Sequence, residues 1–224
     1  MCGRIVQKSP PMEYVSQVFA SEDLVFQDPA GPRYNIPPGT RPLALHRLGG
    51  AVDLDRQYWS WRPQGSKYRM NCARLDKVLA GSWPWKQLIN RGRIVVPADG
   101  WYEWKQLEQA GKPGKQPFYI HRVDEGPLFF AGLSNWRAGA QRDEAHGFAI
   151  VTNDAAGGMV DVHDRRPVAL PPSVAKQWLD PETSVGQALE LLQHGLAETL
   201  FKWHAVKQAV GNSRYELPDA IHPI

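Results

Sequence analysis

The second residue of the chain is a cysteine, in the run Met1-Cys2-Gly3-Arg4. A small residue in this position ordinarily permits removal of the initiator methionine, which would leave a free α-amine beside the thiol of Cys2. The amine titrates near ~7.7–8.0 and a thiol near ~8.5, so both are partly reactive at neutral pH. A 1,2-aminothiol condenses with an aldehyde to an imine, and its thiolate then closes a thiazolidine. A cysteine can also follow Met1 without any function, so Cys2 alone decides nothing.

A carboxylate lies among aromatic residues in the segment Pro97–Lys105, PADGWYEWK. A turn at its start precedes a predicted strand, whose alternation places Trp101, Glu103 and Lys105 on one face. Neighbouring rings can desolvate Glu103, and desolvation raises a carboxyl pKa toward the range useful for proton transfer. The alternative is a solvated strand glutamate in front of an aromatic core.

A third group of polar residues is the run Val162–Pro167, VHDRRP. His163 can act as a general acid or base near neutral pH, and adjacent arginines can hold phosphates. The alternative is a polar turn that leads into a strand at residues 168–170. The seven histidines and two cysteines show no common metal-ligand spacing, so neither a metal nor another cofactor is expected.

The elements that must position these residues read as short strands with few helices. A helix is expected from an N-cap at Ser9 to about Ala20, and loops at Asn35–Thr40 and Lys105–Gln116, the latter as a long hairpin loop. Apolar or aromatic runs bounded by Gly, Pro or Asp predict strands at Pro42–Leu48, Gln57–Trp61, Arg93–Val96, Trp101–Leu107, Phe118–Val123, Leu128–Leu133 and Phe148–Thr152. Further helices are expected at Leu75–Ala80, Trp85–Asn90, Ser173–Leu179 and Ser184–Gln193. This order predicts one α+β domain over residues 1–224 with a curved, mostly antiparallel sheet.

Composition limits the class of protein. The 224 residues are 42% hydrophobic and 22% charged with a net charge of +3, as in ordinary globular proteins that can hold a local basic groove. No apolar run reaches the ~18 residues of a membrane span. Two cysteines, one at the extreme N-terminus, argue against a disulfide framework and for a reducing compartment. A cytoplasmic protein is therefore expected.

Taken together, these segments resemble the SRAP family of SOS-response-associated peptidases, also described as abasic-site processing proteins. The matching runs are Met1–Arg4, Tyr34–Thr40, Ala73-Arg74, Pro97–Lys105, Val151-Thr152, His163–Pro167, Trp203–Val206 and Val210–Asn212. The resemblance extends over nearly the whole chain and implies a barrel-like β core with short peripheral helices.

What the resemblance implies is a covalent trap. Cys2, freed of Met1 by the protein's own peptidase activity, would attack the ring-opened aldehyde of an abasic site in single-stranded DNA and form a lasting crosslink. Glu103 would assist proton transfers at the Cys2 amine, and His163 would promote opening of the sugar. The chain would be a cysteine autopeptidase that also has a lyase-like activity on DNA. It would associate with the nucleoid when bound to DNA, and no membrane or metal would be involved. A monomer would suffice for a groove that binds one strand.

The resemblance also implies a set of DNA and pocket contacts. Residues that would hold phosphates are Arg4, Arg74 and Arg165, and residues that would line the pocket are Asn35, Pro38 and Thr152. The sequence departs from the family at two points. The family has Asn-Ala-Arg where this chain has Asn71-Cys72-Ala73-Arg74, so either Asn71 reaches the site through a shifted backbone or Cys72 stands in its place.

The second departure is a missing tryptophan after Pro63, where the family offers a ring to stack on a base. Trp61 or Tyr68 is the expected substitute.

Two other functions remain open. An N-terminal-nucleophile hydrolase, such as a glutamine amidotransferase domain, would use Cys2 to attack an amide. It gives no role to Glu103 or to residues 163–165. A non-catalytic single-stranded nucleic-acid-binding domain would use the arginines alone, and Cys2→Ala would then change nothing.

Overall fold

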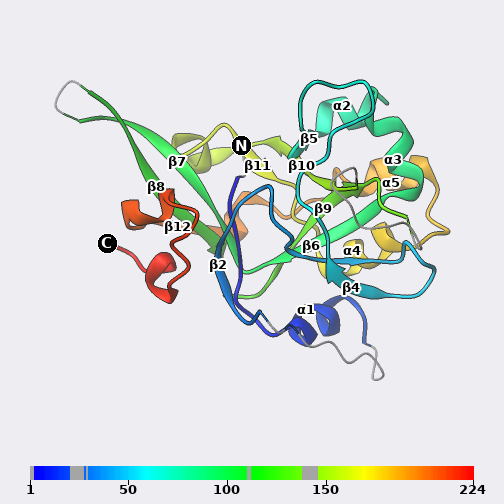
Figure 1. The fold of residues 1–224 in the computed structure, drawn as a ribbon, viewed down its shortest axis with the longest axis horizontal. Coiled ribbons are helices and arrows are strands. Elements are labelled where there is room, and N and C mark those ends of the chain that lie inside the picture. Colours follow the sequence, from blue (N-terminus) through cyan, green and yellow to red (C-terminus); the bar gives the residue numbers. More distant parts are fainter. Residues whose placement is uncertain (1–2, 21–27, 29, 110–111, 138–145) are drawn as a thin grey trace.

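The computed structural model describes residues 3–20, 28, 30–109, 112–137 and 146–224. Its strands form two sheets, so the α+β class and the mostly antiparallel pairing are confirmed. The expected barrel-like core is wrong, because the strands form two open sheets packed face to face and do not close on themselves. Figure 1 shows the long β7–β8 hairpin extending away from the body of the molecule.

The first sheet has five strands in the order β12-β8-β7-β1-β2. Their bounds are Phe201–Ala205, Lys112–Arg122, Gly100–Gln109, Ile5–Gln7 and Arg33–Ile36, respectively. The expected loop over Lys105–Gln116 is wrong, because the β7–β8 ladder continues to the pair Gln109↔Lys112. The expected loop at Asn35–Thr40 begins later than predicted, since Asn35 and Ile36 end strand β2.

The second sheet has the order β11-β10-β9-β6-β3-β4. The bounds of these strands are Arg165–Pro167, Phe148–Asp154, Leu128–Ser134, Arg93–Ala98, Leu43–His46 and Asp53–Arg56. A seventh strand, β5 (Cys72–Arg74), pairs in parallel with β10. The segment expected as a strand at Gln57–Trp61 forms only isolated bridges, Trp59↔Phe148 and Trp61↔Met70.

Alternation along the central strands creates two cores on the two faces of the second sheet. Val95 faces one core, whereas Ile94 and Val96 face the other. The first core is covered by α1 (Pro11–Val18), α2 (Leu75–Leu79), α3 (Trp85–Arg91), α4 (Pro172–Leu179) and α5 (Val185–Leu191). The second core lies between the sheets and contains Trp101 and Phe130, whose rings meet edge to face with centroids 5.8 Å apart.

Short 3₁₀ segments cover the outer face of the first sheet. The segments η3 (Gln208–Gly211) and η4 (Pro218–Ile221) contribute Val210 and Ala220 to a small core with Tyr102 and Tyr119. The layers are therefore helices, second sheet, first sheet and C-terminal 3₁₀ segments (Figure 1). Two more 3₁₀ segments are η1 (Gly157–Asp161) and η2 (Glu198–Leu200).

The starts of α5 and α1 differ in their capping. Ser184 and Gln187 form a reciprocal capping box at the start of α5. The expected N-cap at Ser9 is wrong, because α1 begins after Pro10 with no side-chain cap and the Ser9 hydroxyl donates to Asp99. Among the described residues, no helix combines the length and apolar character required to cross a bilayer.

Candidate functional site

Glu103 lies on β7 beside the N-terminal strand β1. The pairs Val6↔Gly100 and Ile5↔Trp101 set the antiparallel register, and the Tyr102 amide donates to the Arg4 carbonyl at 3.0 Å. Gly100 permits the Tyr119 ring of β8 to pack over β7, since a Cβ at its position would lie 2.4 Å from that ring. Continuing the register by one residue places the backbone of Gly3 opposite Glu103.

Burial gives Glu103 an unusual acidity. Its side chain is 2% exposed, and burial raises the pKa of its carboxyl from the ordinary 4.5 to about 8. The negative charge of Asp164 contributes in the same direction. A carboxyl with this pKa can both take and give a proton near neutral pH, as the flanking rings in the sequence predicted.

His163 faces Glu103 from the loop between η1 and β11. Its Nδ1 lies 3.0 Å from the amide nitrogen of Arg165. Nε2 is 3.8 Å from Glu103 Oε2, and the carboxylate of Asp164 is 3.0 Å from Nδ1. Burial lowers the pKa of His163, and Asp164 opposes that shift. The two groups thus form an acid–base pair with space for a reacting atom near both.

The loop that carries His163 is fixed from the C-terminal part of the chain. The Glu198 carboxylate accepts the amides of Ala156 and Met159, each at 3.0 Å, and the His163 amide donates to the Met159 carbonyl at 3.0 Å. Glu198 is a positioning residue that was not predicted from sequence, because its own segment carries no distinctive motif.

Arg4 connects the start of the described chain to its C-terminal part. Its guanidinium donates to Asn35 Oδ1 at 2.8 Å, to the Val210 carbonyl at 3.0 Å and to the Gly211 carbonyl at 3.2 Å. It also lies over the Trp104 ring, 5.8 Å from the centroid. Burial lowers the pKa of Arg4. Most of its donors are therefore used to hold β1 in place.

Asn35, expected to line the pocket, is held by the C-terminal part of the chain. Its side chain is fully buried, and Nδ2 lies 3.0–3.1 Å from the carbonyls of Val210, Asn212 and Tyr215. Its Oδ1 accepts a hydrogen bond from Arg4 at 2.8 Å. Asn35 therefore orients Arg4, and its direct contact with a ligand stays a prediction.

Thr152 and Arg165 meet at the end of β10. Arg165 donates to the Thr152 carbonyl at 3.0 Å, to Thr152 Oγ1 at 3.3 Å and to Asp154 Oδ1 at 2.5 Å. Thr152 is 1% exposed, so it supports Arg165 from below and does not line an open pocket as expected. Arg165 itself is 13% exposed.

Strand β5 settles which residue stands in the asparagine position. Cys72 pairs with Ile150 and Arg74 with Thr152, and alternation places Cys72 and Arg74 on one face while buried Ala73 points to the other. Burial raises the pKa of the Cys72 thiol to about 12; among charged groups, Glu103 raises it further and Arg165 opposes the shift. Cys72 is therefore the residue that faces Glu103.

Asn71 precedes β5, on the side of the alternation opposite to Cys72. Its carbonyl accepts Trp59 Nε1 at 2.9 Å and the Ile150 amide at 3.1 Å. The catalytic role expected for Asn71 stays a prediction, and β5 places the thiol of the neighbouring Cys72 on the same face as Arg74. The backbone of Asn71 anchors the start of β5.

The two remaining predicted contacts lie toward the loop 62–69. Pro38 is partly buried in the turn after β2, where the Gly39 amide donates to the Trp59 carbonyl at 2.8 Å. Trp61 is 7% exposed and packs on Trp85 with ring centroids 5.9 Å apart, so it cannot stack on a base as expected. Tyr68, at 77% exposed, is the ring that this loop presents to solvent.

A cavity of about 690 Å³ opens beside the acid–base pair. Its lining combines cationic and acidic side chains with an aromatic ring: Arg4, Glu103, Trp104, Lys105, Gln106, Lys115, Val160, Asp161, Val162, His163, Asp164 and Gly211. Cys2 lies outside the described residues. Its covalent neighbour Gly3 reaches the register position of Glu103, at the edge of this cavity.

The amino-acid sequence that forms this site matches a known family over almost the whole chain. The sequence profile described as SOS response associated peptidase (SRAP) matches residues 1–213. The chain belongs to the SRAP family.

Two individual relatives of this SRAP chain bear names that refer to abasic-site processing. It is 37% identical to "Abasic site processing protein YedK" of Escherichia coli K12, over the full length of both proteins. It is 27% identical to "Abasic site processing protein HMCES" of Pongo abelii, with 100% of this chain and 76% of the relative covered.

A solved structure is closer in sequence still. A phage-related protein of Bordetella bronchiseptica, whose crystal structure is known, is 59% identical and superposes with a TM-score of 0.85, covering 97% of this chain and 100% of that one. The SRAP chain therefore shares both sequence and fold with that protein.

Proposed function

We propose that this SRAP protein captures abasic sites in single-stranded DNA by a covalent bond to Cys2. The observation that carries the proposal is the pairing of buried Glu103 with His163, at 3.8 Å, beside the strand whose register leads to residue 2. The relatives named as abasic-site processing proteins support the same substrate.

The chemistry balances with groups of the protein alone. Glu103 takes a proton from the ammonium of Cys2, and the amine adds to the aldehyde carbon of the opened deoxyribose. Loss of one water gives an imine. The thiolate of Cys2 then adds to the imine carbon, the nitrogen is protonated, and a thiazolidine results. His163 takes the proton of the anomeric hydroxyl at Nε2 and delivers it to the ring oxygen, so that the ring C–O bond breaks and the aldehyde forms.

Self-processing uses the same groups. We propose that Glu103 assists hydrolysis of the bond between Met1 and Cys2, so that water is consumed and free methionine leaves. The new α-amine then lies next to the carboxyl that deprotonates it. The measurable result is an intact mass that lacks one methionine when the protein is made with Glu103.

Replacement of Cys2 is the direct test of capture. Purified protein is mixed with a single-stranded oligonucleotide that carries one abasic site and is resolved on a denaturing gel. We expect a heat-resistant shifted band, which Cys2→Ala abolishes. Cys72→Ala removes the other thiol of the chain. Because Cys72 faces Glu103, the rate of capture by this variant is not used as the criterion; a heat-resistant band that still forms shows that Cys72 is not the crosslinking thiol.

Either of two results would contradict the proposal. The first is a full shifted band from Cys2→Ala, and the second is the absence of that band with wild-type protein whose N-terminal cysteine is confirmed by mass. A lesion-free oligonucleotide gives the background. Ammonia release from glutamine, measured on the same sample, reports the hydrolase alternative.

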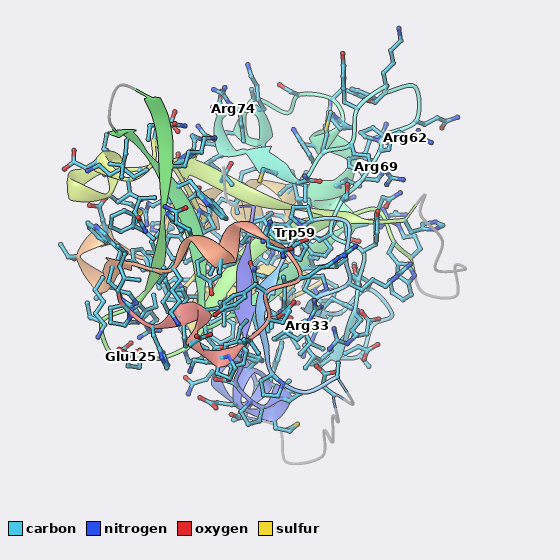
Figure 2. The ribbon with its side chains drawn as sticks, turned by 60° about the vertical axis from the view of Figure 1, so that its left-hand side comes forward. Arg33, Trp59, Arg62, Arg69, Arg74 and Glu125 are labelled. Carbon is cyan, nitrogen blue, oxygen red and sulfur yellow. The ribbon has the colours of Figure 1, made fainter. Side chains whose placement is uncertain are left out.

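Arg74 is proposed as a contact for DNA phosphate. Its side chain is 60% exposed and bonds Asp76 at 2.9 and 3.0 Å; it lies on the same upper side of the molecule as Arg62 and Arg69 (Figure 2). In the Cys2→Ala background, we expect Arg74→Ala to weaken single-strand binding several-fold. The salt slope, which is the steepness with which the logarithm of the binding constant falls with the logarithm of the salt concentration, should decrease by about 0.7.

The measurement is anisotropy titration of a labelled oligonucleotide at four salt concentrations. Arg214→Ala, which removes one exposed arginine elsewhere, should leave the slope unchanged. An Arg74→Ala slope equal to wild type would remove this contact from the interface.

A further inference from the structure

A second basic surface lies away from the acid–base pair, between the helices and the β3–β4 turn. It contains a pocket of about 470 Å³ whose lining is rich in arginine: Arg47, Leu48, Gly50, Asn90, Arg91, Arg93, Arg137, Leu179 and Pro181. In the described part of the chain, this lining holds four guanidinium groups and no carboxylate. The pocket therefore concentrates positive charge.

One of the four arginines has a structural role. Arg93 is 6% exposed and donates to the carbonyls of Trp178, Ile89, Asn90 and Asp180 at 2.7–3.3 Å. It joins the C-terminal ends of α3 and α4, where its charge also offsets the helix dipoles. Arg93 forms the floor of the pocket and has little capacity left for a ligand.

The other three arginines form no ion pair within the described residues. Arg47 lies over the Phe19 ring at 5.1 Å, and its Nε is buried without a hydrogen-bond partner there. Arg137 donates to the carbonyls of Arg91 and Trp136, at 3.3 and 2.9 Å. Burial and the neighbouring charge of Arg91 both lower the pKa of Arg137. Like charges held together in this way are relieved by a bound anion.

Arg137 also connects this pocket to a longer groove. The groove measures about 840 Å³ and is lined by Arg137 together with Arg62, Arg69 and Trp83, the last 58% exposed. No described residue in its lining is acidic. It runs along the loop 62–69, which leads directly into β5 with Cys72 and Arg74; Figure 2 shows Arg62, Arg69 and Arg74 on one side of the molecule.

We propose that Arg47, Arg91 and Arg137 form a phosphate-binding subsite that holds the backbone of DNA extending beyond the crosslinking site. Guanidinium groups bind phosphate oxygens in a directed, bidentate manner. Proteins that bind single-stranded nucleic acid combine cationic side chains, which bind phosphates, with exposed aromatic rings, on which bases stack. The DNA assignment rests on the proposed function, whereas the phosphate chemistry rests on the pocket itself. A free phosphate-type anion shares that chemistry, so the test distinguishes the two sources.

The test uses the Arg91→Ala/Arg137→Ala double variant and lesion-free single strands of about 10 and 30 nucleotides. For the long strand, we expect affinity to fall about tenfold and the salt slope to fall by about 1.4, the value for two lost phosphate contacts at about 0.7 each. The short strand should bind equally to both proteins. Arg91→Lys/Arg137→Lys should recover part of the affinity, and Arg214→Ala should behave as wild type.

Inorganic pyrophosphate provides the second arm. A rise in Tm with pyrophosphate that the double variant lacks, with unchanged binding of the long strand, would assign the subsite to a free phosphate compound. Equal behaviour of wild type and double variant in both arms would overturn the proposal. Capture of an abasic 10-mer is measured in parallel: its failure would contradict the proposed function and leave the arginine subsite intact.

Discussion

Glu103→Gln is expected to slow crosslinking roughly 10²- to 10⁴-fold, the range ordinarily contributed by a positioned acid–base group. Burial raises the pKa of the Glu103 carboxyl to about 8. Glutamine keeps the shape of this side chain but cannot take up or release a proton. Single-turnover capture of an abasic oligonucleotide, followed by denaturing gel, measures the rate. Intact mass should show retained Met1 in the same variant, so the capture rate is measured on Glu103→Gln protein from which a methionine aminopeptidase has removed Met1. A rate within threefold of wild type would exclude Glu103 from the mechanism.

The pH profile separates a titrating role from a merely structural one. Because the ionised carboxylate is the form that takes the proton from the Cys2 ammonium, the wild-type rate should rise with pH up to about 8, the pKa of Glu103. The residual rate of Glu103→Gln should lack this rise. Glu103→Asp, which restores a carboxyl on a shorter side chain, should restore a pH-dependent profile.

The same group makes stability depend on pH in an unusual direction. Burial raises the folded-state pKa of Glu103 from 4.5 to about 8, so between these values the folded protein binds more protons than the unfolded chain. Its contribution is therefore complete below pH 4.5 and is lost as the pH rises to about 8. Relative to wild type, Glu103→Gln should gain in free energy of unfolding over this window.

Asp99→Ala is expected to lower the free energy of unfolding by about 3–5 kcal/mol, since it leaves four donors near a buried position unpaired. The carboxylate of Asp99 is 5% exposed. It accepts the amides of Lys8 and Ser9 at 2.5 and 3.1 Å, the Ser9 hydroxyl at 2.5 Å and the Tyr14 hydroxyl at 2.6 Å. Burial, followed by the charge of Asp99, raises the pKa of Tyr14, which keeps this hydroxyl protonated as a donor.

Denaturant unfolding monitored by tryptophan fluorescence measures this loss. Tyr14→Phe is the matched control, because it removes one donor and leaves the carboxylate with its other partners; about 1–2 kcal/mol is expected. Asp99 also anchors the end of β1, so crosslinking should slow even where Asp99→Ala remains folded. A loss below about 1 kcal/mol would show that these hydrogen bonds do not hold the strand.

The central strands could be predicted because burial on both faces leaves a nearly continuous apolar run. Residues 93–98 and 128–134 are buried at every position. Strands β1, β2, β4, β5, β11 and β12 escaped prediction, since they are short and polar residues interrupt them. Their strand form comes from pairing with neighbours distant in the sequence, which local pattern does not encode.

The long hairpin shows a different limit of the sequence pattern. Pro113 and Gly114 indicate a loop by composition, yet they pair with Glu108 and Leu107. Strand β12 covers only Phe118–Arg122 of β8, so one edge of the earlier part has no strand beside it among the described residues. Proline is tolerated on such an edge because no ladder hydrogen bond is required there.

The candidate site was predictable in its residue types and less so in its geometry. Alternation correctly predicted that Trp101 and Tyr102 face opposite sides of their strand; Trp101 lies in the core between the sheets and Tyr102 in the outer one. The burial of Asn35 and Trp61 was not predictable, because it depends on Val210 and Trp85, which lie far away in the sequence. The choice between Asn71 and Cys72 likewise required the β5–β10 register.

The hydrogen bonds from Arg4 and Asn35 to residues 210–215 join parts of the protein that are far apart in the sequence. Arg4 and the Val210 carbonyl that accepts its hydrogen bond are separated by 206 positions. The strand β1 next to Glu103 is therefore held in part by a segment that contributes no acid or base to the site. Loosening residues 210–215 would displace β1 without any change in Glu103 or His163.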